Sequence, residues 1–141
     1  MGKDFTTNYR EERILNRLDS SKDHLRDRQL QDIRNNVDEL TDRLAQHLID
    51  EHLVVTTNRR ELVRQLAICC DELSRAEDFD INYRIAPFRS VVSNPIFVSL
   101  YITAYIVETL IKHPDVEDVY GTDEEIYRAV NTIVTKFVRL S

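Results

Sequence analysis

The segment from Ser90 to Val107 contains no charged residue, although 31% of the chain is charged. Apolar side chains occupy nearly every position, so a helix formed here has to be surrounded by other elements rather than laid on a surface. Asn94 and Pro95 are typical of a helix start. Pro114 excludes continuation, because it disfavours helical backbone at the residue before it. The sequence therefore predicts a central buried helix over residues 95–113.

The same segment is too short to cross a membrane, since a spanning helix needs about 18–20 apolar residues and Glu108 interrupts this one. The 141 residues fit a single domain. Two glycines and three prolines are too few for a turn-rich sandwich or barrel. We therefore expect an all-α fold, a bundle of about five helices around the central one, with two stacked helical hairpins as one arrangement.

The N-terminal residues 1–20 are predicted to be a loose polar segment with one short helix, which needs a partner surface. The apolar residues of that helix are Ile14, Leu15 and Leu18. Ser20 and Ser21 then indicate a break and a new helix cap. Residues 21–141 are predicted to form the single helical domain.

A heptad seam follows, in which apolar residues alternate three and four positions apart. Its members are Leu30, Ile33, Val37, Leu40 and Leu44. Such a seam is typical of a coiled coil and favours self-association as a homodimer. It is shorter than the roughly three to four heptads that define a coiled coil. One amphipathic helix packing on its own core therefore remains an equal alternative.

Local signals place the other elements. Thr57 and Asn58 offer a helix cap, with Glu61 at the third position after Asn58, and Thr122 followed by Glu125 is a capping box. Each begins an amphipathic helix. Residues 115–121 are expected to form a loop. The segment 79–85 alternates apolar and polar residues, which is a strand pattern. Without a second strand, we expect it to be an extended connector that packs its aromatic rings on the core.

Three close arginines, Arg59, Arg60 and Arg64, open the helix after Asn58, where the helix dipole disfavours positive charge. They predict a patch that binds an acidic protein segment or a phosphate-bearing partner. The alternative is local pairing with Asp50 or Glu51. A second hypothesis is a nucleic-acid regulator with a helix-turn-helix-like pair at residues 36–76. The net charge of −6 counts against it.

One compact group of metal-type ligands occurs, made of His47, Asp50, Glu51 and His52. A metal-dependent enzyme using His47, Glu51 and His52 is the weakest hypothesis, because this spacing does not complete a metal site. His113 and Asp115 would have to supply the remaining ligands. The ordinary interpretation is a polar helix end whose histidines favour the negative pole of the dipole.

The adjacent Cys69 and Cys70 point about 100° apart on a helix, so a disulfide between them would break the helix. Free thiols favour a reducing compartment, and we expect a cytoplasmic protein. No glycine-rich phosphate loop or nucleophile elbow is present, so no cofactor is predicted. The resulting hypothesis is a non-enzymatic interaction or regulatory protein that forms a homodimer.

Overall fold

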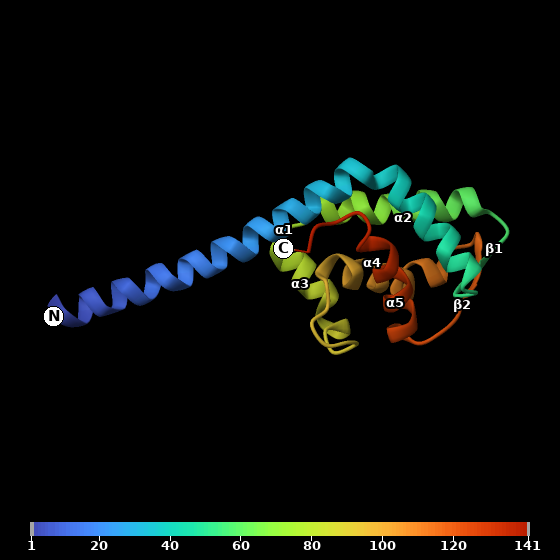
Figure 1. Cartoon of the computed structure of the whole chain (residues 1–141). Helices are drawn as coiled ribbons and strands as arrows, with labels where there is room; N and C mark the ends of the chain where they lie inside the picture. Colours follow the sequence, from blue (N-terminus) through green and yellow to red (C-terminus); the bar gives the residue numbers. More distant parts are fainter. Residues whose placement is uncertain (1, 141) are drawn as a thin grey trace.

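The computed structural model describes the backbone of residues 2–140 and the side chains of residues 24–140. Within that part of the chain it contains five α-helices, two 3-10 turns and one two-stranded sheet. The predicted all-α helical bundle is confirmed (Figure 1). In chain order the elements are α1 (Gly2–Asp50), β1 (Val54–Thr56), α2 (Arg59–Arg75), α3 (Asp78–Ile85), η1 (Ala86–Phe88), α4 (Phe97–Glu108), η2 (Leu110–Lys112), β2 (Val116–Val119) and α5 (Asp123–Val134).

The central helix of the bundle is α4, as the uncharged segment predicts. Every residue from Val98 to Ile106 is buried, and α2, α3 and α5 pack around the helix. Both of its ends differ from the predicted 95–113, because α4 ends at Glu108 and the 3-10 turn η2 follows. Asn94 has a left-handed φ of 51°, and the cap position is Ile96, which has no side-chain cap. The backbone N–H of Ile96 donates instead to the hydroxyl of Tyr127, at 3.0 Å. A residue of α5 therefore satisfies the helix start that Asn94 was expected to cap.

Helix α1 runs through Ser20 and Ser21 without the expected break. The interruption lies at Asn36, where φ is −124° and ψ is 15°. The side-chain amide of Asn36 donates to the carbonyl of Asp32 at 2.8 Å. Figure 1 shows the first part of α1 projecting away from the bundle. The side chains of its apolar residues lie outside the described part of the chain, and a separate segment at residues 1–20 stays a prediction.

The heptad seam faces the core of its own chain. Ile33, Leu40 and Leu44 are no more than 1% exposed. Leu30 and Val37 are partly buried and pack against the same core. This is the second of the two arrangements that the sequence left open. Self-association through these residues stays a prediction, and it would require α1 to leave the core that it covers.

The short sheet joins the two halves of the chain. Strands β1 and β2 pair antiparallel, with Val54 opposite Val119 and Thr56 opposite Val116. The expectation that residues 115–121 form only a loop is therefore wrong. Strands of three and four residues, one from each half, can form hydrogen bonds only after the helices bring them together.

The expectation of an extended connector at residues 79–85 is also wrong, because Asp78–Ile85 forms helix α3. Ile81 and Ile85 are buried, whereas Phe79 and Tyr83 are 76% and 77% exposed. In each pair the residues are four positions apart, which places them on one face of a helix. The alternation that indicated a strand therefore also supplies two opposite helix faces.

Candidate functional site

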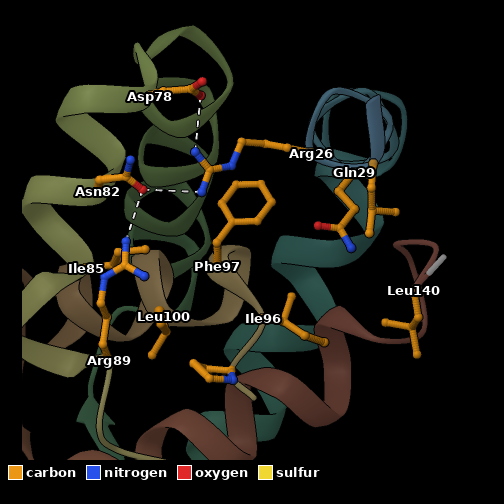
Figure 2. Close-up of a pocket in the computed structure, with 12 residues that line it drawn as sticks. Arg26, Gln29, Asp78, Asn82, Ile85, Arg89, Ile96, Phe97, Leu100 and Leu140 are labelled. Carbon is orange, nitrogen blue, oxygen red and sulfur yellow. Dashed lines mark hydrogen bonds and ion pairs between the residues drawn. The ribbon is translucent and has the colours of Figure 1, made fainter. Parts of the chain in front are cut away.

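The inner side of α3 is attached to the rest of the bundle by Arg26 of α1 (Figure 2). One guanidinium nitrogen of Arg26 pairs with Asp78 at 3.2 Å, and the other donates to Asn82 at 3.4 Å. The guanidinium also lies 4.5 Å from the centre of the Phe97 ring. Arg89 donates to the same oxygen of Asn82 at 3.2 Å. These contacts, together with buried Ile81 and Ile85, determine which face of α3 is turned outward.

The outward face of α3 carries an exposed aromatic pair. The rings of Phe79 and Tyr83 stack with their centroids 6.5 Å apart and their planes 21° apart. About three quarters of each residue is accessible to water. Burying a side chain of this kind contributes about 1.5–3 kcal/mol of hydrophobic free energy. The free protein does not gain this free energy at Phe79 and Tyr83, because both remain exposed. A paired, exposed aromatic surface is typical of a protein interaction site.

A cavity of about 650 Å³ adjoins this pair. We call the aromatic pair together with this cavity the α3 surface. The cavity is lined by Asp80, Tyr83, Arg84, Ala86, Pro87, Tyr101 and Glu108. The lining therefore combines aromatic and proline side chains with two carboxylates. These residues come from α3, η1 and α4.

The single positive charge that lines this cavity, Arg84, is already engaged. Its guanidinium lies over the rings of Tyr101 and Tyr105, at 5.2 and 5.8 Å from their centroids. One terminal nitrogen donates to the hydroxyl of Thr109 at 3.0 Å. Its Nε is buried and has no hydrogen-bond acceptor in the described part of the chain. Arg84 is therefore held against the protein by the two rings, and its charge compensates part of the acidic surroundings.

Two carboxylates, those of Asp80 and Glu108, line the cavity together with Arg84, so the lining carries one net negative charge. Burial raises the pKa of the Tyr101 hydroxyl. Burial likewise raises the pKa of Tyr105 to about 12. Neither Asp80 nor Glu108 has an ion-pair partner among residues 24–140. The α3 surface is therefore aromatic and, on balance, acidic.

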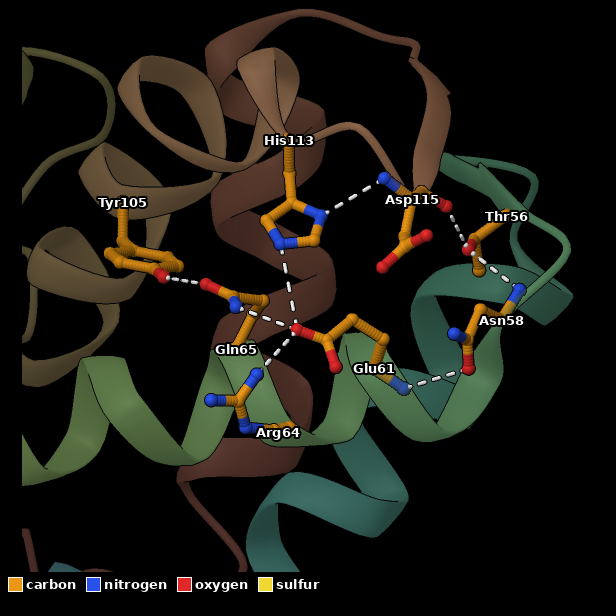
Figure 3. A network of polar contacts seen from close by, with 8 residues as sticks. All are labelled: Thr56, Asn58, Glu61, Arg64, Gln65, Tyr105, His113 and Asp115. Carbon is orange, nitrogen blue, oxygen red and sulfur yellow. Dashed lines mark hydrogen bonds and ion pairs between the residues drawn. The ribbon is translucent and has the colours of Figure 1, made fainter.

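A second polar cluster centres on Glu61 at the start of α2 (Figure 3). One carboxylate oxygen accepts hydrogen bonds from Arg64 and Gln65, both at 2.9 Å, and lies 3.5 Å from Nε2 of His113. The bond from Gln65 is the largest cause of the lowered pKa of Glu61. Gln65 in turn accepts from the hydroxyl of Tyr105 at 2.7 Å. This network attaches α2 to α4 and to the segment that precedes β2.

Glu61, His113 and Asp115 bring one ligand atom each within 4.8 Å of one another, a spacing that a metal ion could use. The hydrogen bonds argue against that role. The backbone N–H of Asp115 donates to Nδ1 of His113 at 3.1 Å, so the proton of the neutral ring is on Nε2 and faces Glu61. A metal-binding Nε2 needs the reverse tautomer, with Nδ1 donating to an acceptor. The cluster is therefore a hydrogen-bonded structural network.

The predicted metal ligands at the end of α1 do not gather with His113 and Asp115, which lie beside Glu61. His47 and Glu51 line a surface hollow with Glu125 and Arg128. His52 is exposed and has a left-handed φ of 58°. Asp50 accepts a hydrogen bond from Gln46 at 2.8 Å. This arrangement matches a polar helix end.

Two of the three predicted partner-binding arginines have acidic partners in their own chain. Arg59 pairs with Asp42 of α1 at 2.8 Å, rather than with Asp50 or Glu51. Arg64 pairs with Glu61 at 2.9 Å. Arg60 is exposed and has no ion pair among residues 24–140. An anion-binding patch at Arg59, Arg60 and Arg64 stays a prediction that these contacts weaken.

The helix pair at residues 36–76 is an antiparallel hairpin. Asp42 of α1 pairs with Arg59 at the start of α2, and Arg34 donates to the carbonyl of Ser74 near its end, at 2.6 Å. Its two helices are connected by residues 51–58, which include β1. A helix-turn-helix uses a turn of roughly three to four residues and a crossing near 90–120°. Nucleic-acid binding by this pair stays a prediction without a supporting contact.

The remaining candidate groups belong to the core. Burial raises the pKa of the Cys69 thiol well above its usual range and that of Cys70 to about 12. Both thiols therefore stay protonated and unreactive. The hydroxyl of Thr103 donates to the carbonyl of Ser99 at 2.7 Å, within its own helix.

Sequence reasoning missed the α3 surface. The signal that could have revealed it is the pair Asp78 and Asp80 in the first turn of a helix, where the dipole favours acidic residues. Together with the spacing of Ile81 and Ile85, they favour a helix over a strand.

No protein-family model, curated protein or solved structure matches this chain. Among the described residues, no helix combines the length and the apolar character that a membrane crossing needs. The function therefore has to be inferred from the chemistry of the site.

Proposed function

We propose that this chain is a non-enzymatic interaction protein that binds a protein partner through the α3 surface. The observation that carries the proposal is the stacked, exposed pair of Phe79 and Tyr83. Covering both rings would contribute roughly 3–6 kcal/mol before the entropic cost of association. Such a contribution suits the centre of an interface.

The position of the pair in the fold supports a role in binding rather than in stability. Helix α3 is already held by Ile81 and Ile85 on its buried face and by the contact of Arg26 with Asp78. Neither aromatic ring is needed to cover the core. Large aromatic side chains that are exposed and contribute little to the fold are best explained by a partner protein that covers them.

The titratable groups outside this surface also support a non-enzymatic role. The thiols of Cys69 and Cys70 are buried and protonated. One carboxylate oxygen of Glu61 already accepts hydrogen bonds from Arg64 and Gln65. Free thiols fit a reducing compartment such as the cytoplasm.

The test compares partner capture by the wild-type chain with capture by the double variant Phe79→Ser/Tyr83→Ser in extracts of the source cells. Tyr120→Ser is the matched control, because Tyr120 is an exposed aromatic residue, at 52%, that follows β2, and β2 lies away from α3 (Figure 1). The proposal predicts a bound protein that the double variant loses and the control retains. Equal capture by all three chains would refute it. Isotope-labelled chain identifies whether the captured protein is a second copy.

A further inference from the structure

We propose that the α3 surface recognises a positively charged segment of its partner, with a lysine or arginine side chain entering the cavity beside Tyr83. This inference rests on the proposed function and specifies the chemistry of the partner. Its basis is the set of charges around the cavity, not the aromatic pair alone.

The lining of the cavity carries one net negative charge. Its charged side chains are those of Asp80, Glu108 and Arg84. A cation that enters the cavity would meet the carboxylates of Asp80 and Glu108 beside the ring of Tyr83. Charge-assisted hydrogen bonds to the carboxylates favour that arrangement.

An acidic segment would meet the opposite situation. The one positive side chain that lines the cavity, Arg84, donates to Thr109 and lies against two tyrosine rings. Its Nε is buried, which removes that donor from an incoming anion. Repulsion from Asp80 and Glu108 would oppose the approach.

The apolar part of the surface fits the alkyl part of a basic side chain. Lysine and arginine bury their methylene groups along apolar surfaces while their charged ends reach polar groups. Tyr83 and Pro87 line the cavity beside Asp80 and provide such a surface. A basic residue next to an apolar one, which would cover Phe79, is therefore the segment that fits best.

The test uses the full chain, labelled with nitrogen-15, and three synthetic peptides of equal length that alternate leucine with lysine, glutamine or glutamate. Nuclear magnetic resonance maps the site from amide shifts and gives the dissociation constant. We expect the lysine peptide to shift the amides of residues 79–86 and of Glu108. Its affinity should fall as salt concentration rises, because exposed charges are screened.

The decisive comparison is between two double variants that remove the same net charge. Asp80→Asn/Glu108→Gln removes the carboxylates of the cavity. Asp38→Asn/Glu117→Gln removes exposed carboxylates elsewhere, neither of which has an ion pair in the described part of the chain. The cavity variant should bind the lysine peptide about fivefold or more weakly, whereas the control should bind within about twofold of wild type. Circular dichroism verifies that each variant is folded.

Three results would overturn the inference: equal weakening by both double variants, shifts that map outside the α3 surface, or preference for the glutamate peptide. The failure of the inference is distinguishable from failure of the proposed function. If Phe79→Ser/Tyr83→Ser abolishes partner capture but the lysine peptide does not bind, the interaction surface stands and its charge preference is wrong. If capture is also unchanged, both proposals are wrong.

Discussion

Phe79 and Tyr83 stack on the outer face of α3, with ring centroids 6.5 Å apart and about three quarters of each residue exposed. The opposite face of the same short helix buries Ile81 and Ile85. One eight-residue helix therefore separates the side chains that hold the fold from those available to a partner. This separation allows stability and binding to be measured independently.

Replacing both aromatic residues by serine should change the free energy of unfolding by less than about 0.5 kcal/mol per residue, since exposed side chains contribute little. Ile81→Ala should cost about 2–5 kcal/mol, because it leaves a cavity in the core. Urea denaturation measures both. Large destabilisation by the serine variant would show that the rings pack against the fold.

Ile102→Ala and Ile106→Ala should each destabilise the protein by about 2–5 kcal/mol, because both residues are fully buried on α4. Ile111→Ala is the control, since this isoleucine is 45% exposed and should cost less than either core change. The denaturation midpoints of the three variants and the wild type measure these differences in stability. Near-neutral core variants would mean that α4 is not the centre of the bundle.

Arg59→Glu should destabilise the protein by about 1 kcal/mol, because it replaces an exposed ion pair with Asp42 by a like-charge contact. Arg60→Glu should be within about 0.5 kcal/mol of wild type, since Arg60 has no such partner in the described part of the chain. Thermal unfolding of the two single variants separates these cases. Equal effects would contradict the different environments of the two arginines.

Arg139 joins the C-terminal segment to α1 through Asp32, and its hydrogen bond lowers the pKa of that carboxyl below 3.8. The lowered pKa means that the unfolded chain takes up the proton first as pH falls. The stability from this pair is therefore complete above about pH 3.8 and disappears as pH falls through the lowered pKa. Asp32→Asn should flatten the pH dependence of unfolding in that acidic range. In Arg139→Ala, the pKa of Asp32, followed by nuclear magnetic resonance, should return towards 3.8; an unchanged pKa would refute the assignment.

Zinc should not raise the unfolding temperature, because Nε2 of His113 carries the proton that faces Glu61. Differential scanning calorimetry with and without zinc chloride tests this directly. A saturable increase that His113→Ala abolishes would instead establish a metal site at Glu61, His113 and Asp115.

The sequence by itself determined two kinds of feature: those that depend on residues close together in the chain, and the burial of a segment made almost entirely of apolar residues. The uncharged segment had to become an enclosed helix, because any exposed face would leave apolar side chains in water. The caps at Asn58 and Thr122 are confirmed, with their side-chain oxygens accepting from Glu61 and Glu125 at 3.1 and 3.2 Å. These bonds span three residues, so local sequence is sufficient to specify them.

The tertiary structure decided which surfaces meet. The heptad seam fits a second chain or its own core equally well by pattern, and only the packing of α1 on the bundle distinguishes them. Segment 79–85 supports a strand by alternation and a helix by its four-residue spacing; the core that receives Ile81 and Ile85 selects the helix. Asp42, the partner of Arg59, is 17 residues away in the chain. Such choices depend on contacts between distant segments, whose free energy becomes available only when the whole bundle forms.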